Sequence, residues 1–533
     1  MSHRCFSLVY ATPFCVIVML SVTLGCSEPP PATNEPPQHV ILVVFDALRA
    51  DHLGSYGYVR NTSPFIDKLA EEGVLFEQAY SNSSYTRESV SSYMMGLYPS
   101  RTPWSGGWEA FPDPDITTLP EFFKKSGYHT AFFSNTLMLN HPDFYKRFDT
   151  YECFMHLAGL SGLGPKLSER AVSFIEENQN EYTFTYLHYF DPHSPYDPPE
   201  EWYTRFAEEV YPNKLTLHDH IRDNFVDLVK TGFGPGNPDF EDFMLRYDVE
   251  IAYEDHSLST LFNQLKDMGA LDNAVIVFTS DHGEEFLDHG FLEHAWRLYP
   301  ESIHVPLIFW SPKRFKPRRI TERVELTALL PTLLKIAQID LPKSRECDGL
   351  PLFEFSQGEW VSKPYNKPII SELLVGMRNI VRSVIDDNLQ YIAAPKYMGP
   401  AEMSDVWNNA NDVRYEYLAG KRTAPDLWGS LHYEALFDLS VDPTAMNNII
   451  ADHTDIRDAR RLLLDNYRHQ CPRQIPDPAK AARSPNTITQ EMQETLQSLG
   501  YLDPKVTPQG SPEEASGPSP DETEEILRGI GYL

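Results

Sequence analysis

The sequence predicts an α/β fold with a mostly parallel β-sheet sandwiched between helices, followed by a smaller C-terminal antiparallel α+β subdomain. Two observations predict the main fold. Continuous apolar segments, such as residues 40–45 and 274–280, are typical of strands buried on both faces of a sheet. Amphipathic helical segments lie between these strands, and this alternation is the pattern of parallel sheets covered by helices.

The elements follow in order from the first strand, residues 40–45, which ends at Asp46. The next helix has Thr62 or Ser63 as its cap, Pro64 in its first turn and Gly73 after its end. A strand is expected at 74–80 and a helix at 88–95. Further strands are expected at 129–133, 182–187, 274–280 and 305–311, and further helices at 119–126, 166–178, 242–268 and 326–338. Residues 214–238 have no assignment.

The pattern changes near residue 365. Short alternating segments at 379–384, 390–394 and 435–439 predict a small antiparallel sheet, with a helix at 456–469. We therefore assign residues 39–364 to a catalytic domain and 365–471 to a C-terminal subdomain. Residues 472–533 form a linker and tail rich in Pro, Ser and Glu, with a short repeat, ETLQSLGYL and EILRGIGYL.

The N-terminal segment predicts export. Residues 1–25 resemble a signal peptide, and Leu24, Gly25 and Cys26 resemble a bacterial lipoprotein cleavage site, which would place a lipid on Cys26. Ordinary signal cleavage or an uncleaved anchor remain alternatives. Residues 26–38 are a Pro-rich tether. We expect the protein in the bacterial periplasm or at the outer cell surface, attached to the membrane by this lipid or anchor.

The overall composition excludes one class of partner. The 533 residues carry a formal net charge of −31. Like charges repel, so a nucleic-acid backbone is not an expected partner. A small-molecule, glycan or lipid ester substrate is compatible with this charge.

Three ionisable side chains stand where buried strands end. Asp46 follows the strand at 40–45, and Asp281 and His282 follow the strand at 274–280. Ligands and metals gather at the carboxyl ends of strands in open α/β sheets. Two carboxylates and an imidazole suit a divalent ion such as Mn²⁺, Zn²⁺ or Ca²⁺. The sequence therefore predicts a metal site.

A hydroxyl and two histidines complete the predicted site. Thr86 lies just before a predicted helix N-terminus, where free amides favour an anion, although it could serve only as the N-cap. His193 belongs to a cluster with His188 and Asp191, and His294 lies in the loop after His282. Either His193 or His294 could protonate a leaving oxygen. These groups are the parts needed for ester cleavage at phosphorus or sulfur.

At these motifs the chain resembles the sulfatase family, within the alkaline phosphatase superfamily. The matching stretches are VVFDALRADHLGSYGY, SNSSYTRESVSSYMMGLYPSR, YLHYFDPHSPYDPP, FTSDHGEEFLDHG, ESIHVPLIFW and, near the C-terminus, ALFDLSVDPTAMNNI and LQSLGYL. The resemblance implies that Thr86 is the nucleophile and also a metal ligand. It further implies metal ligation by Asp46, Asp281 and His282, with the transferred group bound or protonated by His193 and His294.

Departures from the family pattern bear on the substrate. The sulfatase motif C-x-P-S-R or S-x-P-S-R begins with a Cys or Ser that is oxidised to formylglycine, whereas Thr86 stands in that place here. Glu88 replaces the Pro, and Val90 replaces the Arg. Threonine is not a substrate for that oxidation, so these changes resemble the branch in which an unmodified Thr attacks phosphorus.

Two more departures from the sulfatase pattern also favour a phosphoester substrate. Asn135 and Leu137 replace the Lys and His of the sulfatase segment G-K-W-H-x-G, so Asn135 becomes the expected substrate-binding residue there. His282 replaces the Asn that is common in calcium-binding sulfatases, which favours a transition metal. We therefore expect cleavage of a phosphate monoester or diester, a phosphonate ester or a phospholipid headgroup.

Three alternatives stay open from the sequence. Ser83 or Ser84 could be the processed residue of a sulfatase that acts on sulfated polysaccharide. The attack could end in transfer of a phospholipid headgroup to a second acceptor. A degenerate cell-surface binding protein is the third reading, because Arg and Lys are missing around the pocket.

Overall fold

The computed structural model describes residues 32–102, 116–154, 162–210, 234–290, 292–374, 381–394 and 433–470. The predicted signal peptide and the linker and tail from residue 472 lie outside the described residues, as does most of the unassigned region at 214–238.

An eight-stranded sheet forms the centre of the described fold. Its strands lie in the order β10 (Arg318–Glu325), β2 (Val74–Tyr80), β9 (His304–Trp310), β6 (Ala274–Ser280), β1 (His39–Phe45), β5 (Thr183–Tyr189), β3 (His129–Ser134) and β4 (Thr150–Cys153). Only β9 runs against its neighbours, β2 and β6; the other pairs are parallel. The predicted, mostly parallel α/β sheet is therefore confirmed.

The alternating residues of β1 pack into two different cores, one on each face of the sheet. Val40, Leu42 and Val44 belong to one core, and Ile41 and Val43 belong to the other. Because neighbouring side chains of a strand point to opposite faces, both faces of the sheet must be covered. This explains why the sequence of β1 is apolar throughout.

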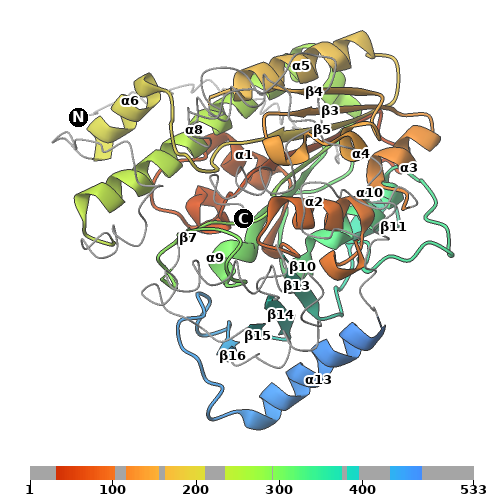
Figure 1. Ribbon diagram of the computed structural model, residues 1–533. Helices are drawn as coiled ribbons and strands as arrows, with labels where there is room; N and C mark the ends of the chain where they lie inside the picture. Colours follow the sequence, from red (N-terminus) through yellow and green to blue (C-terminus); the bar gives the residue numbers. More distant parts are fainter. Residues whose placement is uncertain are drawn as a thin grey trace, which may run out of the picture. The chain divides into compact units, whose positions relative to one another are not determined.

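Helices cover both faces of the sheet (Figure 1). One face is covered by α1 (Pro64–Glu72), α5 (Gly164–Glu177) and α8 (Pro238–Asp267), whose apolar side chains share the core of Ile41. The other is covered by α2 (Thr86–Met95), α3 (Leu119–Lys125) and α10 (Leu329–Ile336). Further described helices are α4 (Pro142–Tyr145), α6 (Glu200–Val210) and α9 (Pro300–Ile303). The helices that the sequence predicted in these regions are present, with ends shifted by a few residues.

A second, antiparallel sheet follows, as expected. It contains β13 (Ile369–Leu373), β14 (Val381–Asp386), β15 (Leu389–Ala394) and β16 (Tyr433–Asp438), and α13 (Thr454–Gln470) packs against it (Figure 1). Two small hairpins complete the described strands: β7 (Glu285–Phe286) with β8 (Leu292–Glu293), and β11 (Phe353–Ser356) with β12 (Glu359–Ser362). The domain division at residues 364 and 365 stays a prediction.

The antiparallel sheet joins the segment that leads into α2. The Ser371 hydroxyl donates to the carbonyl oxygen of Ser81 at 2.7 Å, and the Glu372 amide donates to that of Asn82 at 2.8 Å. These bonds fix β13 beside the segment between β2 and α2.

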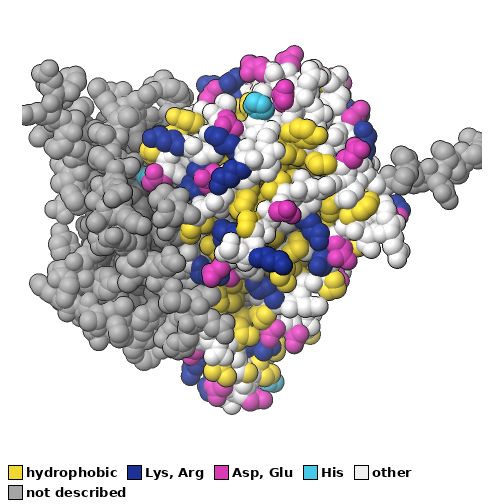
Figure 2. Space-filling model, turned by 90° about the vertical axis from the view of Figure 1, so that its right-hand side faces the viewer, with side chains coloured by type: hydrophobic (Ala, Val, Ile, Leu, Met, Phe, Trp, Pro, Cys, Tyr) yellow, Lys and Arg dark blue, Asp and Glu magenta, His cyan; other side chains and the backbone are white. Residues whose placement is uncertain are grey.

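The described surface is mixed in character. Figure 2 shows the molecule turned by 90° from the view of Figure 1. On this face, Lys and Arg side chains of the described residues are interspersed with Asp and Glu side chains. In the part of the chain that the structure describes, no helix has the length and apolar character needed to cross a membrane.

Candidate active site

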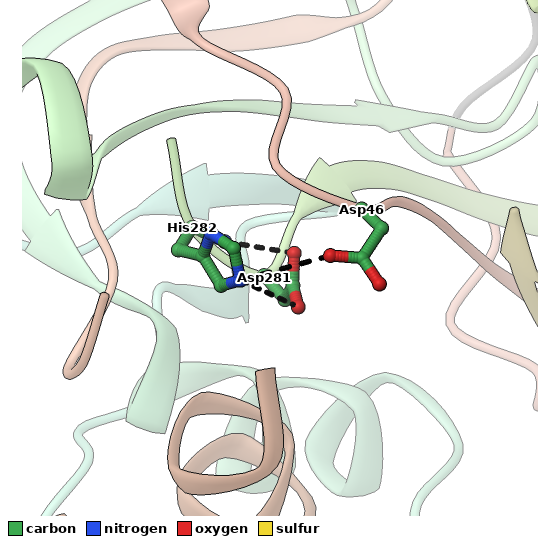
Figure 3. A group of neighbouring side chains, drawn as sticks. All are labelled: Asp46, Asp281 and His282. Atoms are coloured by element: carbon green, nitrogen blue, oxygen red, sulfur yellow. Dashed lines mark hydrogen bonds and ion pairs between the residues drawn. The ribbon is translucent and has the colours of Figure 1, made fainter. Parts of the chain in front are cut away.

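Two neighbouring strands deliver three ionisable side chains to one edge of the sheet. Asp46 follows β1, and Asp281 and His282 follow β6. Phe45 pairs with Ser280 in the parallel register, so the two strands end at the same level. All three side chains are fully buried and point toward one another (Figure 3). The structure thus brings together the three residues that the sequence predicted as metal ligands.

His282 directs one ring nitrogen at both carboxylates. Its Nε2 lies 3.6 Å from Asp46 Oδ1 and 3.5 Å from Asp281 Oδ2. Its Nδ1 lies 2.8 Å from the carbonyl oxygen of Gly283, which can only accept, so Nδ1 carries the proton of the neutral ring. The lone pair of Nε2 therefore faces the carboxylates. This is the tautomer that a metal-binding histidine needs.

The hydrogen bonds of Asp281 are incomplete on one side. Its Oδ1 accepts from the amides of Ala47 at 3.2 Å and His282 at 2.9 Å. No donor among the described residues makes a hydrogen bond to the buried Oδ2. Burial, with the nearby charge of Asp46, raises the pKa of Asp281 to about 6. One ligand atom from each of Asp46, Asp281 and His282 lies within 4.8 Å of the others, so the group fits a divalent cation.

The electrostatics of the two remaining members of the group agree with this fit. Burial raises the pKa of Asp46. Burial disfavours the charged form of His282, but Asp281 and Asp46 outweigh it and raise its pKa. Each shift reflects two buried carboxylates that lack a full positive partner, which a divalent ion would supply.

Thr86 reaches this group from α2. It is the first residue of that helix, after Tyr85 in extended conformation, and Gly96 in the left-handed region ends the helix. Thr86 Oγ1 lies 3.1 Å from His282 Nε2 and 3.5 Å from Asp46 Oδ1. Thr86 is therefore not the N-cap of α2, which is Tyr85, so the alternative that it serves only as a cap is wrong. The amides at the start of a helix favour an anion beside this hydroxyl.

The two neighbouring serines do not reach the group. The Ser83 hydroxyl donates to Glu88 Oε2 at 2.8 Å, and the Ser84 hydroxyl donates to the carbonyl oxygen of Arg297 at 2.8 Å. Both serines are fully buried in these contacts. Among the three hydroxyls that the sequence offered, Thr86 is the one beside Asp46 and His282.

Both predicted acid residues line the same site. The ring centroid of His294 lies 4.4 Å from that of His282, and the ring centroid of His193 lies 4.7 Å from that of His294. Glu284 Oε1 lies 2.9 Å from His294 Nδ1 and orients that ring, while the Tyr196 hydroxyl donates to Glu284 Oε2 at 2.8 Å. Burial lowers the pKa of His193 to about 3, so its ring is neutral near pH 7.

Asn135 lies after β3, at the same edge of the sheet. Its Oδ1 accepts from the amide of Phe190 at 2.8 Å, so the side chain supports the loop that carries His193. Two further side chains near the site that could in principle bind a metal, Asp191 and His289, have other contacts. Asp191 Oδ2 accepts from the amide of Gly162 at 2.7 Å, and His289 Nδ1 lies 2.5 Å from Glu301 Oε1.

The sequence did not predict the supporting roles of two residues, His188 and Glu284. His188 Nε2 lies 3.2 Å from Asp46 Oδ2, and Glu284 holds His294. Burial lowers the pKa of His188 to about 4. The signal for His188 was its position near the end of a buried strand, but its partner depends on the pairing of His188 with Val44 between β5 and β1.

Comparisons with known proteins indicate the family of this chain. A family model described as Sulfatase matches residues 38–339. Human iduronate 2-sulfatase is 25% identical over 416 residues, which cover 61% of this chain and 74% of that protein.

Two solved structures share the fold. One is the structure of BT4656 in complex with its substrate D-glucosamine-2-N,6-O-disulfate. The match has a TM-score of 0.63 at 16% identity and covers 84% of this chain and 100% of the other. The other is the phosphonate monoester hydrolase of Agrobacterium radiobacter, with a TM-score of 0.59 at 17% identity, covering 83% of this chain and 97% of the other. This fold therefore accompanies both sulfate and phosphonate chemistry.

Proposed function

The chain belongs to the sulfatase family, and from that premise we propose that it is a metal-dependent hydrolase that cleaves a phosphoester through Thr86 as an unmodified nucleophile. The observation that carries the proposal is the position of Thr86 Oγ1, 3.1 Å from His282 Nε2 and 3.5 Å from Asp46 Oδ1. A threonine in this place cannot be oxidised to the aldehyde that sulfate-processing members use. Its hydroxyl is left to attack directly.

The residues that follow Thr86 support the same choice. Glu88, in the place of the sulfatase Pro, accepts hydrogen bonds from Ser83 and from the amide of Leu374. Val90, in the place of the sulfatase Arg, is buried in the apolar core on the α2 face of the sheet. These two positions thus serve packing in this chain and contribute no guanidinium to the site.

The metal would be held by Asp46, Asp281 and His282 together with the Thr86 oxygen. Bound there, a divalent ion such as Mn²⁺, Zn²⁺ or Ca²⁺ would lower the pKa of the Thr86 hydroxyl and neutralise the negative charge of the phosphoryl oxygens. His282 supplies a nitrogen ligand, which favours Mn²⁺ or Zn²⁺ over Ca²⁺.

The chemistry then follows from the positions of the side chains. The Thr86 hydroxyl gives its proton to solvent water, and Oγ1 forms a bond to phosphorus while the ester P–O bond breaks. His294, oriented by Glu284 through Nδ1, gives a proton from Nε2 to the leaving oxygen. The Asn135 amide donates to a phosphoryl oxygen. The Ser194 carbonyl oxygen, 2.5 Å from His193 Nδ1, keeps the proton of neutral His193 on Nδ1, so its Nε2 binds the phosphoryl group only by accepting from a P–OH. Attack on the phosphothreonine by water restores Thr86, and attack by a second hydroxyl would make the protein a transferase.

One second candidate has support of its own. The human relative is named an iduronate 2-sulfatase, and one solved structure with this fold holds a disulfated glucosamine as substrate. Cleavage of a sulfate ester of a glycan, with Ser83 or Ser84 as the processed residue, is therefore the alternative.

The deciding experiment compares matched nitrophenyl esters. The protein without residues 1–38 is assayed on the sulfate, the phosphate monoester, the phosphodiester and the phosphonate monoester, each with Mn²⁺, Zn²⁺ or Ca²⁺. Thr86→Ala is the test variant, and Ser83→Ala and Ser84→Ala are its controls. Phosphoester turnover that is lost only in Thr86→Ala supports the proposal. Sulfate turnover that survives Thr86→Ala and disappears in a serine variant overturns it in favour of the alternative.

We also propose that Cys26 carries a lipid and anchors the exported protein, because residues 24–26 match most of a lipoprotein cleavage site. Incorporation of labelled fatty acid into the wild-type protein, and none into Cys26→Ser, is the expected result. Equal labelling of both proteins would contradict this assignment.

A further inference from the structure

A continuous hydrogen-bonded chain of buried side chains leads from α2 to Asp46. The hydroxyls of Tyr93 and Tyr186 lie 2.7 Å apart, and the Tyr186 hydroxyl lies 2.7 Å from His188 Nδ1. His188 Nε2 lies 3.2 Å from Asp46 Oδ2. All four side chains are fully buried. The chain of contacts uses none of the groups that the proposed chemistry assigns to the substrate.

The acceptors fix the direction of every bond in this chain. A carboxylate only accepts, so the contact with Asp46 places the proton of His188 on Nε2. The other nitrogen, Nδ1, is then an acceptor and receives the proton of the Tyr186 hydroxyl. The Tyr186 oxygen can in turn accept from the Tyr93 hydroxyl. All three donors therefore point toward Asp46, and bonds in such a chain polarise and strengthen one another.

The hydrogen-bonded side chains also connect Asp46 back to α2. Tyr93 and Thr86 are seven residues apart in that helix, which is about two turns, so they lie on the same face. Asp46 Oδ1 lies 3.5 Å from Thr86 Oγ1, whereas Oδ2 is bound to His188. Each oxygen of Asp46 is thus connected to a different end of α2.

We propose that Tyr93, Tyr186 and His188 are positioning residues that hold the Asp46 carboxylate with Oδ1 toward the metal and Thr86. The proposal rests on the assignment of Asp46 as a metal ligand in the proposed function. Partners that orient metal ligands from outside the coordination sphere commonly change metal affinity by about 10-fold to 100-fold. The measurable consequence is therefore the affinity for the ion, with no need for a substrate.

The positioning role can be tested with a matched pair of variants on β5. Tyr186→Phe removes the middle hydroxyl of the chain. Tyr189→Phe is the control, because Tyr189 is also on β5, is equally buried, and has its hydroxyl 2.9 Å from Ser168 Oγ on the other face of the sheet. Mn²⁺ titration of the metal-free proteins, followed by electron paramagnetic resonance, should show at least 10-fold weaker binding in Tyr186→Phe and less than 2-fold change in Tyr189→Phe.

Two substitutions of His188 distinguish its role in orienting Asp46 from its role in packing. A Gln side chain can place an N–H donor near the position of His188 Nε2, whereas a Leu side chain of similar bulk cannot. We expect His188→Gln to bind Mn²⁺ at least 5-fold more tightly than His188→Leu. Tyr93→Phe, at the far end of the chain, should show a smaller loss than Tyr186→Phe and provides a test if Tyr186→Phe does not fold.

The outcomes also separate this inference from the proposed function. Asp46→Ala should lose Mn²⁺ binding. If Asp46→Ala loses binding but Tyr186→Phe and Tyr93→Phe bind like Tyr189→Phe, the positioning chain is wrong and the metal site stands. If Asp46→Ala binds Mn²⁺ like the wild type, both the metal assignment and the positioning chain are wrong.

Discussion

Two buried carboxylates, Glu325 and Asp281, differ in how completely their oxygens are bound. Glu325, at the end of β10, is fully buried and both of its oxygens have donors. Oε1 lies 3.0 Å from Tyr98 Oη, 2.8 Å from Tyr365 Oη and 3.2 Å from Lys367 Nζ. Oε2 lies 3.1 Å from Asn82 Nδ2 and 3.3 Å from the amide of Ile370.

Asp281 is equally buried, but its Oδ2 accepts no hydrogen bond from the described residues and faces Asp46 across His282. A buried polar atom without a partner costs free energy, so it persists only where something else uses it. Glu325 joins the two sheets through bonds to both of its oxygens. Asp281 instead has one unbound oxygen beside Asp46 and His282, where we propose that a cation binds.

The largest effect that would test this contrast is the loss of Asp281. Asp281→Ala should lower kcat/KM by at least about 1000-fold, the scale seen when a group that stabilises transition-state charge is removed. It should also abolish uptake of the metal. The melting temperature of the metal-free protein should change little, because removing a buried acid with an unbound oxygen offsets the loss of the two amide hydrogen bonds to Oδ1. Ester turnover and metal content measure the first effects; surviving activity would show that Asp281 is not a ligand.

The converse variant is Glu325→Gln, which keeps the size of the side chain. An amide nitrogen would then face donors that need an acceptor, and Lys367 would lose its buried counter-charge. We expect a loss of about 3 kcal/mol in the free energy of unfolding, read from the urea midpoint. The metal affinity and the turnover per folded molecule should change less than about 3-fold, within the scatter of indirect effects. A loss of turnover without a loss of stability would show that Glu325 acts in the reaction and not mainly in the fold.

The same contrast explains what the sequence could predict. Apolar strands buried on both faces, ending in Asp46 and in Asp281 with His282, were visible as patterns because both the strand and its end are local features. The direction of β9 was not visible, because strand direction depends on pairing with β2 and β6. The edge strands β4 and β10 were also missed, since charged residues interrupt their apolar pattern.

The supporting residues of the site depend on contacts between distant segments. His188 meets Asp46 only because β5 pairs with β1 in one register. Glu284 and Glu285 are adjacent in sequence, and only the structure shows that Glu284 binds His294 while Glu285 accepts from Ser302. The grouping of side chains at strand ends can therefore be predicted from one sequence, whereas the residues that orient them require the fold.

Metal removal sharpens the comparison further. An ion that binds only the folded protein stabilises it by about 2.7 kcal/mol when its free concentration is 100 times the dissociation constant. The wild type and Glu325→Gln should therefore lose the same increment on treatment with a chelator, whereas Asp281→Ala should lose none. Thermal unfolding of each protein with and without Mn²⁺ gives this measurement. An increment in Asp281→Ala equal to that of the wild type would place the stabilising ion elsewhere.

A third buried acid, Asp255 of α8, lies between the two cases. It accepts hydrogen bonds from the amides of Phe65 and Ile66 at the start of α1. Burial raises the pKa of Asp255 to about 7, against the opposing effect of these amide bonds. The folded state thus holds more protons than the unfolded state between about pH 4 and pH 7, because an unfolded Asp titrates near 4.

The sign of the pH dependence follows from that difference. The contribution of Asp255 to the free energy of unfolding is largest below about pH 4 and is lost as the pH rises toward 7, with a slope of at most about 1.4 kcal/mol per pH unit. Asp255→Asn removes this titration, so its stability relative to the wild type should rise over the same interval and then level off. Urea midpoints of both proteins at several pH values test this; parallel curves would mean that the ionised carboxylate is as well bound as Glu325.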